Sequence, residues 1–274
     1  MPTTKYSAAE HEQMEEALEY WTPERMASAV PVDLTEPDKG PLPGKFITDR
    51  IENPADDSVH RRAGRLYVSL DGYDVFCSAS AINNNGILTA AHSLYNANTQ
   101  KFADKGIYSP AWNNGVSRYG TFPLTGRGFI PDAYQITARY QYDYGFSKVG
   151  PGGPGPDKKE LGSVTGHFEL RVSKSTEKQW DALGYPSVPV DGYQFNGQRM
   201  WRCLGDRFFE NVRGQNGKEG NFTEGSSGGP WLMPGTHFVT GIQVMSTTSN
   251  GIPVNVSPYF DEEVIALYNK AFNS

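Results

Sequence analysis

Apolar positions recur at helical spacing only near the two ends of the chain. Residues 7–20 are predicted to form a helix, because Ser7 can cap its first turn and Glu10 stands three positions later, as a capping box requires. The apolar stripe of this helix is Met14, Leu18 and Trp21. Pro23 should end it. Residues 261–272 predict a second helix, with acidic residues in its first turn.

Between these ends the pattern changes to short apolar runs separated by turn residues. Residues 65–70 and 73–81 flank Asp71-Gly72, which predicts a β-hairpin, and residues 86–90 predict the next strand. Further strands are predicted at 136–142, 144–149, 167–172, 198–203 and 238–245. The stretch 23–57 is rich in Pro, Asp and Gly and has no sustained periodicity, so an extended arm or linker is expected there.

A Gly/Pro-rich run at 150–156 interrupts the strands near the middle of the chain. Many short strands, a central break and a terminal helix together favour two consecutive β-barrels. The fold alone would not define a function.

Composition is compatible with a globular enzyme and excludes some other classes. The 274 residues are 37% hydrophobic and 20% charged, which is enough to form a core. A net charge of -6 argues against a nucleic-acid-binding surface. The sequence contains no run of about eighteen apolar residues, so no membrane span is predicted. No apolar signal core follows Met1, so the signal of a secreted product would already be removed from this chain.

The segment Glu224 to Trp231 reads Glu-Gly-Ser-Ser-Gly-Gly-Pro-Trp and is the main candidate for a nucleophile. A serine hydroxyl needs a base to take its proton and preformed donors for the oxyanion that it creates. Glycines allow a tight turn that directs backbone N–H groups inward, so Gly225 and Ser227 are predicted to form an oxyanion hole. The alternative is an inert Gly/Ser loop.

Two upstream residues are candidates for the partners of Ser227. His92 follows Thr-Ala-Ala, and small residues let an imidazole lie against a barrel. Asp143 stands among aromatic residues, where orienting the imidazole would satisfy its carboxylate. The alternatives are a histidine satisfied at a strand edge and an aspartate facing water. Asp132 is a weaker rival because it follows Pro131 in a turn.

The order of these residues discriminates between protease folds. An α/β-hydrolase runs Ser, acid, His, but the sequence after Ser227 has no acid before its one histidine, His237. A subtilisin-like order would need an acid before His92 and helical crossovers that the pattern lacks. The order that remains is His92, Asp143, Ser227.

With these motifs the chain resembles the chymotrypsin-like (trypsin-like) serine peptidases, especially the microbial branch that includes the glutamyl endopeptidases. The matching segments are 77–80, 89–92, 142–146, 184–186 and 225–231. The resemblance covers the chain from about Arg65 to its end. It implies an all-β fold of two consecutive six-stranded antiparallel barrels. The implied division is 1–60 as an N-terminal arm or propeptide-like segment, 61–160 as the first barrel, and 161–274 as the second barrel with the C-terminal helix.

The same resemblance implies a secreted, monomeric serine endopeptidase that cleaves protein or peptide substrates through an acyl-enzyme. It implies no cofactor, no metal, no nucleic acid and no membrane partner. Residues 20–29 look like the propeptide region of many secreted members. A latent zymogen, a permanent N-terminal arm and a non-catalytic peptide-binding module on the same scaffold therefore stay open as alternatives.

Several positions depart from the family pattern. Cys77 and Cys203 each lack the cysteine that usually pairs with them, so two free thiols are expected. Ser226 replaces the aspartate that binds a new N-terminal ammonium in trypsin and chymotrypsin, so activation by that ion pair is not available.

The substrate pocket is less well defined by the sequence. Asn221 stands six residues before the nucleophile, where an aspartate would select Arg or Lys. Gln243 stands where glutamyl-specific members carry a histidine, and its neutral amide should discriminate less. The residues expected at the pocket are Asn221, Glu224, Gln243 and Ser246. No preferred substrate residue follows from them.

Overall fold

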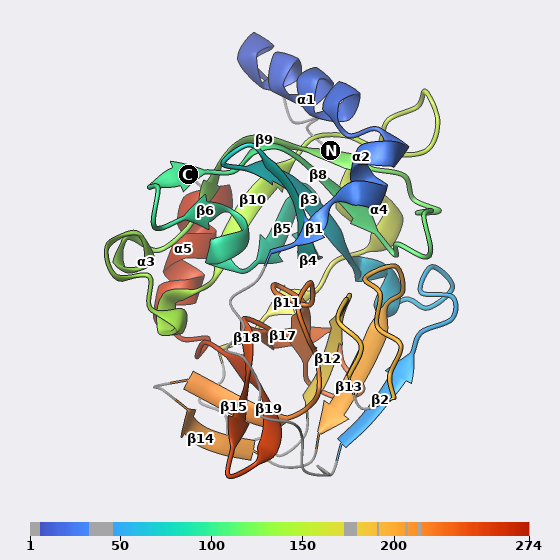
Figure 1. Ribbon diagram of the computed structural model, residues 1–274. Helices are drawn as coiled ribbons and strands as arrows, with labels where there is room; N and C mark the ends of the chain where they lie inside the picture. Colours follow the sequence, from blue (N-terminus) through green and yellow to red (C-terminus); the bar gives the residue numbers. More distant parts are fainter. Residues whose placement is uncertain are drawn as a thin grey trace.

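Antiparallel strands make up most of the regular structure, with helices at the ends of the chain (Figure 1). The computed structural model describes residues 6–32, 46–172, 180–190, 192–205, 208–212 and 215–273. Among these residues, no helix is long and apolar enough to cross a membrane.

The first half of the chain forms a closed six-stranded barrel. Its strands are β3 (Ala63–Leu70), β4 (Tyr73–Asn83), β5 (Gly86–Thr89), β8 (Asp104–Pro110), β9 (Phe122–Phe129) and β10 (Gly145–Val149). They bond in the order β4-β3-β8-β9-β10-β5, and β5 also pairs with β4, which closes the barrel. The predicted hairpin is confirmed: Leu70 pairs with Tyr73. Asp71 and Gly72 both take positive φ, as a tight primed turn requires.

The second half of the chain, joined by β2 from the N-terminal part, forms two sheets below the first barrel (Figure 1). The six-stranded sheet runs β11-β17-β16-β12-β13-β2. Its strands are β2 (Phe46–Arg50), β11 (Glu169–Leu170), β12 (Trp180–Gly184), β13 (Trp201–Gly205), β16 (Pro230–Leu232) and β17 (Phe238–Ile242). The four-stranded sheet runs β14-β15-β19-β18. Its strands are β14 (Phe208–Val212), β15 (Gln215–Glu219), β18 (Met245–Ser249) and β19 (Ile252–Ser257).

The remaining elements are short. They are β6 (Tyr95–Asn96), β7 (Lys101–Phe102), α3 (Asp132–Thr137), α4 (Leu161–Thr165) and 3₁₀ turns at His60–Arg62, Ala91–Ser93 and Tyr140–Tyr142. The prediction of a strand at 136–142 is therefore wrong. Alternating side chains in this segment mimic a strand, but Pro131 precedes a short helix that ends where Ala138 takes a left-handed conformation. The strand at 144–149 is confirmed as β10, and the one at 167–172 is reduced to Glu169–Leu170.

Both terminal helices are confirmed. Ser7 caps α1 (Ala8–Tyr20) and forms the predicted capping box with Glu10. Met14 and Trp21 are buried as expected, but Leu18 is 38% exposed, and Ala17 takes its place in the core. At the other end, Asp261 caps α5 (Glu262–Phe272), which packs beside β10 of the first barrel (Figure 1).

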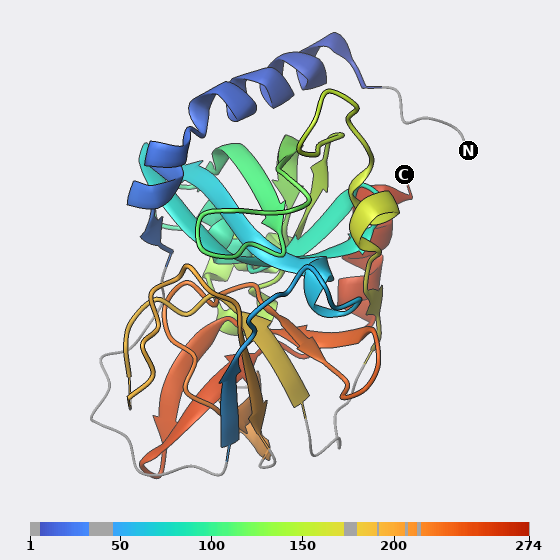
Figure 2. The same cartoon turned by 90° about the vertical axis from the view of Figure 1, so that its right-hand side faces the viewer.

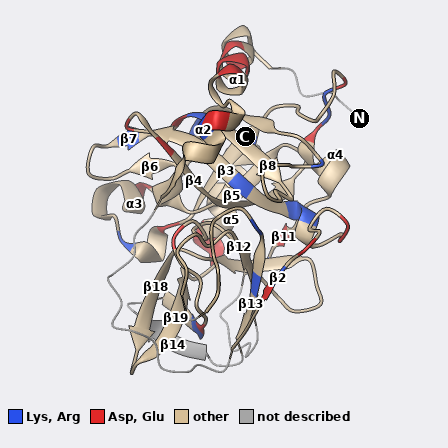
Figure 3. Ribbon diagram, turned by 45° about the vertical axis from the view of Figure 1, so that its right-hand side comes forward, with Lys and Arg blue, Asp and Glu red and all other residues tan. Residues whose placement is uncertain are grey.

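The expectation of an extended arm or linker at 23–57 is wrong for the described residues of this stretch, because they include a helix and two paired strands. Pro23 ends α1 as predicted but opens α2 (Pro23–Ser28), because a proline suits the first position of a helix. β1 (Val30–Pro31) then pairs in parallel with β4, and β2 joins the edge of the second-half sheet beside β13. Residues 33–45 lie outside the described residues. Figure 2 shows α1 lying across the first barrel, and in Figure 3 the acidic residues of that helix are coloured red.

Candidate active site

His92 and Asp143 lie next to each other at one end of the first barrel. His92 belongs to the 3₁₀ turn that follows β5, and Asp143 immediately precedes the residues that enter β10. Because β5 and β10 pair with Thr89 opposite Gly145, the two side chains meet. His92 Nδ1 lies 2.7 Å from Asp143 Oδ2, and the backbone N–H of His92 donates to Asp143 Oδ1 at 2.9 Å.

Burial determines which ring nitrogen of His92 carries the proton. Asp143 is fully buried and His92 is 5% exposed. Because a buried carboxylate needs hydrogen-bond donors, Asp143 favours the tautomer of His92 that carries its proton on Nδ1. The other ring nitrogen, Nε2, is buried and has no hydrogen-bond partner among the described residues. This arrangement leaves Nε2 free to act as a base.

The predicted nucleophile turn lies against the strand that leads to His92. Gly228 has a φ of +83°, and a Cβ at this position would overlap with Thr89 Oγ1. The turn therefore requires glycine for both its conformation and its close approach to β5. Ser227 is 4% exposed, and its hydroxyl has no hydrogen-bond partner among the residues that the structure describes.

The two predicted oxyanion donors are unengaged. Within the described ranges, the backbone N–H groups of Gly225 and Ser227 donate to no protein group. Gly225 has a φ of +86°, and a Cβ there would lie 2.7 Å from both the Phe76 ring and the carbonyl oxygen of Tyr185. The turn thus combines a serine hydroxyl with backbone N–H groups that have no acceptor among the described residues, as an oxyanion hole requires.

The predicted pocket residues are brought beside this turn, but two of them are committed to internal bonds. Gln243 bonds Gly228 and Gly229 through its backbone, its Nε2 donates to Met245 O at 2.7 Å, and its Oε1 lies 3.3 Å from Trp231 Nε1. Ser246 Oγ donates to the carbonyl oxygen of Phe222 and lies 3.3 Å from Gln243 Nε2. A direct substrate contact by either polar group would have to replace these bonds.

The other two predicted pocket residues, Asn221 and Glu224, stand a few positions before Ser227. Asn221 is 4% exposed, its Oδ1 accepts a 2.7 Å hydrogen bond from Thr48 Oγ1, and its Nδ2 has no partner among the described groups. Glu224 is partly exposed. Thr48 is a residue that the sequence did not reveal, because it lies in β2, a strand that pairs with β13 far along the chain.

The two cysteines are free, as expected, and both are buried. Burial in an apolar environment raises the pKa of the Cys77 thiol to about 11, so it is a poor nucleophile. Cys77 is therefore not a competing candidate for the nucleophile.

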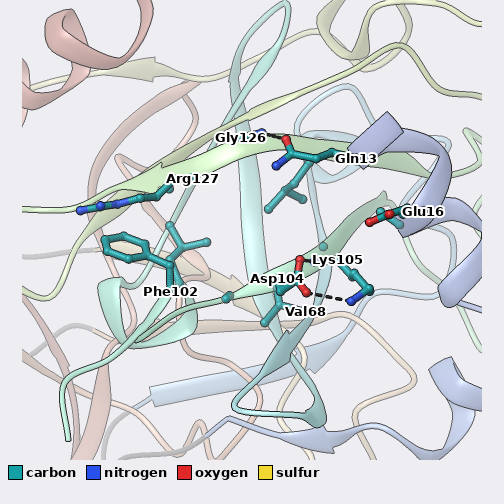
Figure 4. Close-up of a pocket in the computed structure, with 14 residues that line it drawn as sticks. Gln13, Glu16, Val68, Phe102, Asp104, Lys105, Gly126 and Arg127 are labelled. Carbon is teal, nitrogen blue, oxygen red and sulfur yellow. Dashed lines mark hydrogen bonds and ion pairs between the residues drawn. The ribbon is translucent and has the colours of Figure 1, made fainter. Parts of the chain in front are cut away.

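A separate pocket lies between α1 and the strands β8 and β9 (Figure 4). Gln13 and Glu16 line it from the helix, and Lys105 and Arg127 line it from the strands. The amide oxygen of Gln13 accepts a hydrogen bond from Gly126 N at 3.0 Å. None of the candidate catalytic residues borders this pocket, so it is not part of the site.

Comparisons with known proteins agree on the fold. No family model and no curated protein sequence matches the chain. Among solved structures, the protease Anisep from Arthrobacter nicotinovorans is 22% identical with a TM-score of 0.70, covering 83% of this chain and 100% of its own. The thermostable serine protease AL20 from an extremophilic microorganism is 24% identical with a TM-score of 0.69, covering 81% and 100%. A Glu endopeptidase is 22% identical with a TM-score of 0.67, covering 83% and 97%.

The fold is that of the chymotrypsin-like serine proteases. The all-β architecture and the resemblance inferred from the motifs are confirmed at this level. The solved structures to which the chain is similar include a microbial serine protease and a Glu endopeptidase.

Proposed function

We propose that the chain is a serine endopeptidase with His92, Asp143 and Ser227 as its catalytic triad. The observation that carries the proposal is the buried His92–Asp143 pair, 2.7 Å apart, with Nε2 of His92 left without a partner among the described residues. The Gly225–Ser227 turn beside β5 supplies the other two requirements, a hydroxyl and unengaged N–H donors.

In the proposed mechanism, Ser227 Oγ attacks a peptide carbonyl carbon while His92 Nε2 accepts the hydroxyl proton. The negative charge on the carbonyl oxygen is stabilised by the N–H groups of Gly225 and Ser227. His92 then protonates the departing amine, and water hydrolyses the acyl-enzyme. Catalytic hydrogen bonds are commonly long without substrate, so the unbonded Ser227 hydroxyl is compatible with this role.

For substrate preference, the proposal is limited to two selections that are not expected to be strong. Asn221 offers a neutral amide where basic-specific members carry a carboxylate, so strong selection of Lys or Arg is not expected. The internally bonded Gln243 makes a purely acidic preference weak as well. Secretion and cleavage of a propeptide are proposals that rest on the resemblance alone.

A fluorescent phosphonate probe tests the proposal. We expect the purified full chain to be labelled and to cleave a peptide library. Ser227→Ala should abolish both, and Ser226→Ala, at the neighbouring buried serine, should keep the label. Labelling at Ser227 only after proteolysis before residue 60 would support a latent zymogen. Absence of labelling and cleavage before and after that treatment would favour a non-catalytic module and overturn the proposal.

A further inference from the structure

We propose that Ser187 and Ser78 are positioning residues that hold the oxyanion turn in its donating conformation. This inference rests on the proposed peptidase function. It concerns three successive peptide groups, those that join residues 224 to 227. Each of the two serines donates its hydroxyl hydrogen to a main-chain carbonyl of the turn.

Ser187 acts on the peptide group that carries the first oxyanion donor. The carbonyl oxygen of Glu224 accepts two hydrogen bonds from Ser187, at 2.8 Å from its backbone N–H and at 2.9 Å from its Oγ. A trans peptide is planar, so its C=O and N–H point in opposite directions. Fixing the Glu224 carbonyl toward Ser187 therefore directs the Gly225 N–H to the opposite side.

Ser78 acts on the next peptide group and on the one after the nucleophile. Its Oγ donates to the carbonyl oxygen of Gly225 at 2.9 Å, and its backbone N–H donates to the carbonyl oxygen of Ser227 at 2.8 Å. Ser78 Oγ also accepts from Tyr185 N at 3.0 Å, which sets the direction of its own hydrogen. The carbonyl oxygen of Ser78 accepts from Thr89 Oγ1 at 2.8 Å, on the strand that leads to His92.

The turn needs such restraints because of its composition. Gly225 has no Cβ to restrict rotation of the adjacent peptides. Ser226 provides no carboxylate for a new N-terminal ammonium, and its Oγ and N–H both bond Thr223 O. The hydroxyls of Ser187 and Ser78, together with the bond from Gly229 N to Ser226 O at 2.9 Å, hold the three peptide groups without an ion pair. The site is therefore assembled in the full chain.

Alanine variants of the two serines test this role, with Ser80→Ala as the matched control. Ser80 lies two residues after Ser78 in β4, is fully buried, and its hydroxyl has no hydrogen-bond partner among the described residues. The measurements are kcat and KM for a chromogenic peptide, the Ki of a peptide aldehyde that forms an oxyanion on Ser227, and the melting temperature. Ser78→Thr keeps the hydroxyl and serves as the conservative variant.

We expect Ser187→Ala and Ser78→Ala each to lower kcat by about 10- to 100-fold, below the ~10²–10³-fold loss typical of removing a donor outright. KM should change little, and the aldehyde Ki should rise in parallel with the loss in kcat. Ser80→Ala should match the parent, and Ser78→Thr should recover most of the activity. The double variant should lose less than the product of the single losses, because both serines hold one turn.

Two outcomes separate the inference from the function on which it rests. If the parent is labelled and active but both variants behave like Ser80→Ala, or lose melting temperature with unchanged kcat per labelled site, the positioning role is wrong and the peptidase proposal stands. If the protein neither reacts with the probe nor cleaves peptides, both before and after proteolysis ahead of residue 60, both proposals fall together. Ser187 is only half-buried, so its variant provides a test even if Ser78→Ala does not fold.

Discussion

At the scale of single residues, Asp143 directs both of its carboxylate oxygens to one neighbour. One oxygen contacts the ring of His92 and the other accepts the backbone N–H of the same residue. The second bond restrains the position of the imidazole as well as its tautomer. A carboxylate held this way has little freedom to serve any other partner, which separates it from the exposed Asp132.

Asp143→Asn should lower kcat by about 10⁴-fold, because an amide that donates to Nδ1 favours the tautomer with its proton on Nε2. Asp132→Asn, at the rival acid in the sequence, should leave kcat unchanged. The check is kcat for a chromogenic peptide, with melting temperatures to show that both variants fold. If the Asp132 variant lost activity while the Asp143 variant stayed active, the assignment of Asp143 as the acid of the triad would be wrong.

The residues of the triad could be proposed from the sequence because short motifs carry them in a diagnostic order. The local environment of the pocket could not. Gln243 was expected to face substrate, yet its amide bonds Met245 and Trp231, and nothing in the linear pattern encodes those contacts. The serine hydroxyls that bond the turn come from β4 and from the segment after β12, which meet only in the folded chain.

At the scale of elements, Lys218 joins the two sheets of the second half. It lies in β15 and is fully buried, and its Nζ donates to Trp180 O of β12 at 3.1 Å and to Cys203 O of β13 at 2.8 Å. The ammonium also lies 5.1 Å from the centre of the Trp231 ring. Burial lowers the pKa of Lys218 from 10.5 to about 8, because the charged form loses its hydration.

This pKa shift predicts a pH-dependent stability. Since the unfolded chain binds the proton of Lys218 more tightly, stability should rise relative to Lys218→Met as pH increases from about 8 to about 10.5. The full change is about 3 kcal/mol. Below about pH 8, Lys218 is protonated in both the folded and the unfolded chain, so the difference in unfolding free energy between the two proteins should not change with pH. Urea unfolding of both proteins from pH 6 to 10.5 measures it, and a constant difference over the whole range would contradict the shift.

Local signals predicted the elements that depend on neighbours in sequence. The capping box of α1, the Asp71-Gly72 turn and the C-terminal helix are such cases. Long-range pairing was not predictable in this way. β2 pairs through its backbone with β13, about 150 residues later, and its outward Ile47 is 59% exposed, so no alternation of buried residues marked it as a strand.

At the scale of the whole molecule, the N-terminal segment is packed into the first barrel. Trp21 is 5% exposed, contacts the Tyr67 ring at a centroid distance of 5.4 Å, and donates its indole N–H to the carbonyl oxygen of Lys105. Arg25 forms a 2.8 Å ion pair with Asp74. β1 pairs with residues 75–76 of β4, and Ser78 lies two residues after Phe76 on the same strand. The segment thus supports the strand that holds the nucleophile turn.

These contacts predict that residues 6–32 stabilise the folded protein and do not inhibit the proposed activity. Trp21→Ala should cost about 3–5 kcal/mol of unfolding free energy, as expected for a buried indole, while Leu18→Ala, on the exposed side of the same helix, should change little. Removal of residues 1–32 should lower the melting temperature and should not increase labelling by the phosphonate probe. Denaturant unfolding and probe titration of the four proteins provide the measurement. A truncated chain that melts like the parent and reacts faster would show that the segment is an inhibitory propeptide, and would leave the assembled turn inferred for the full chain without support.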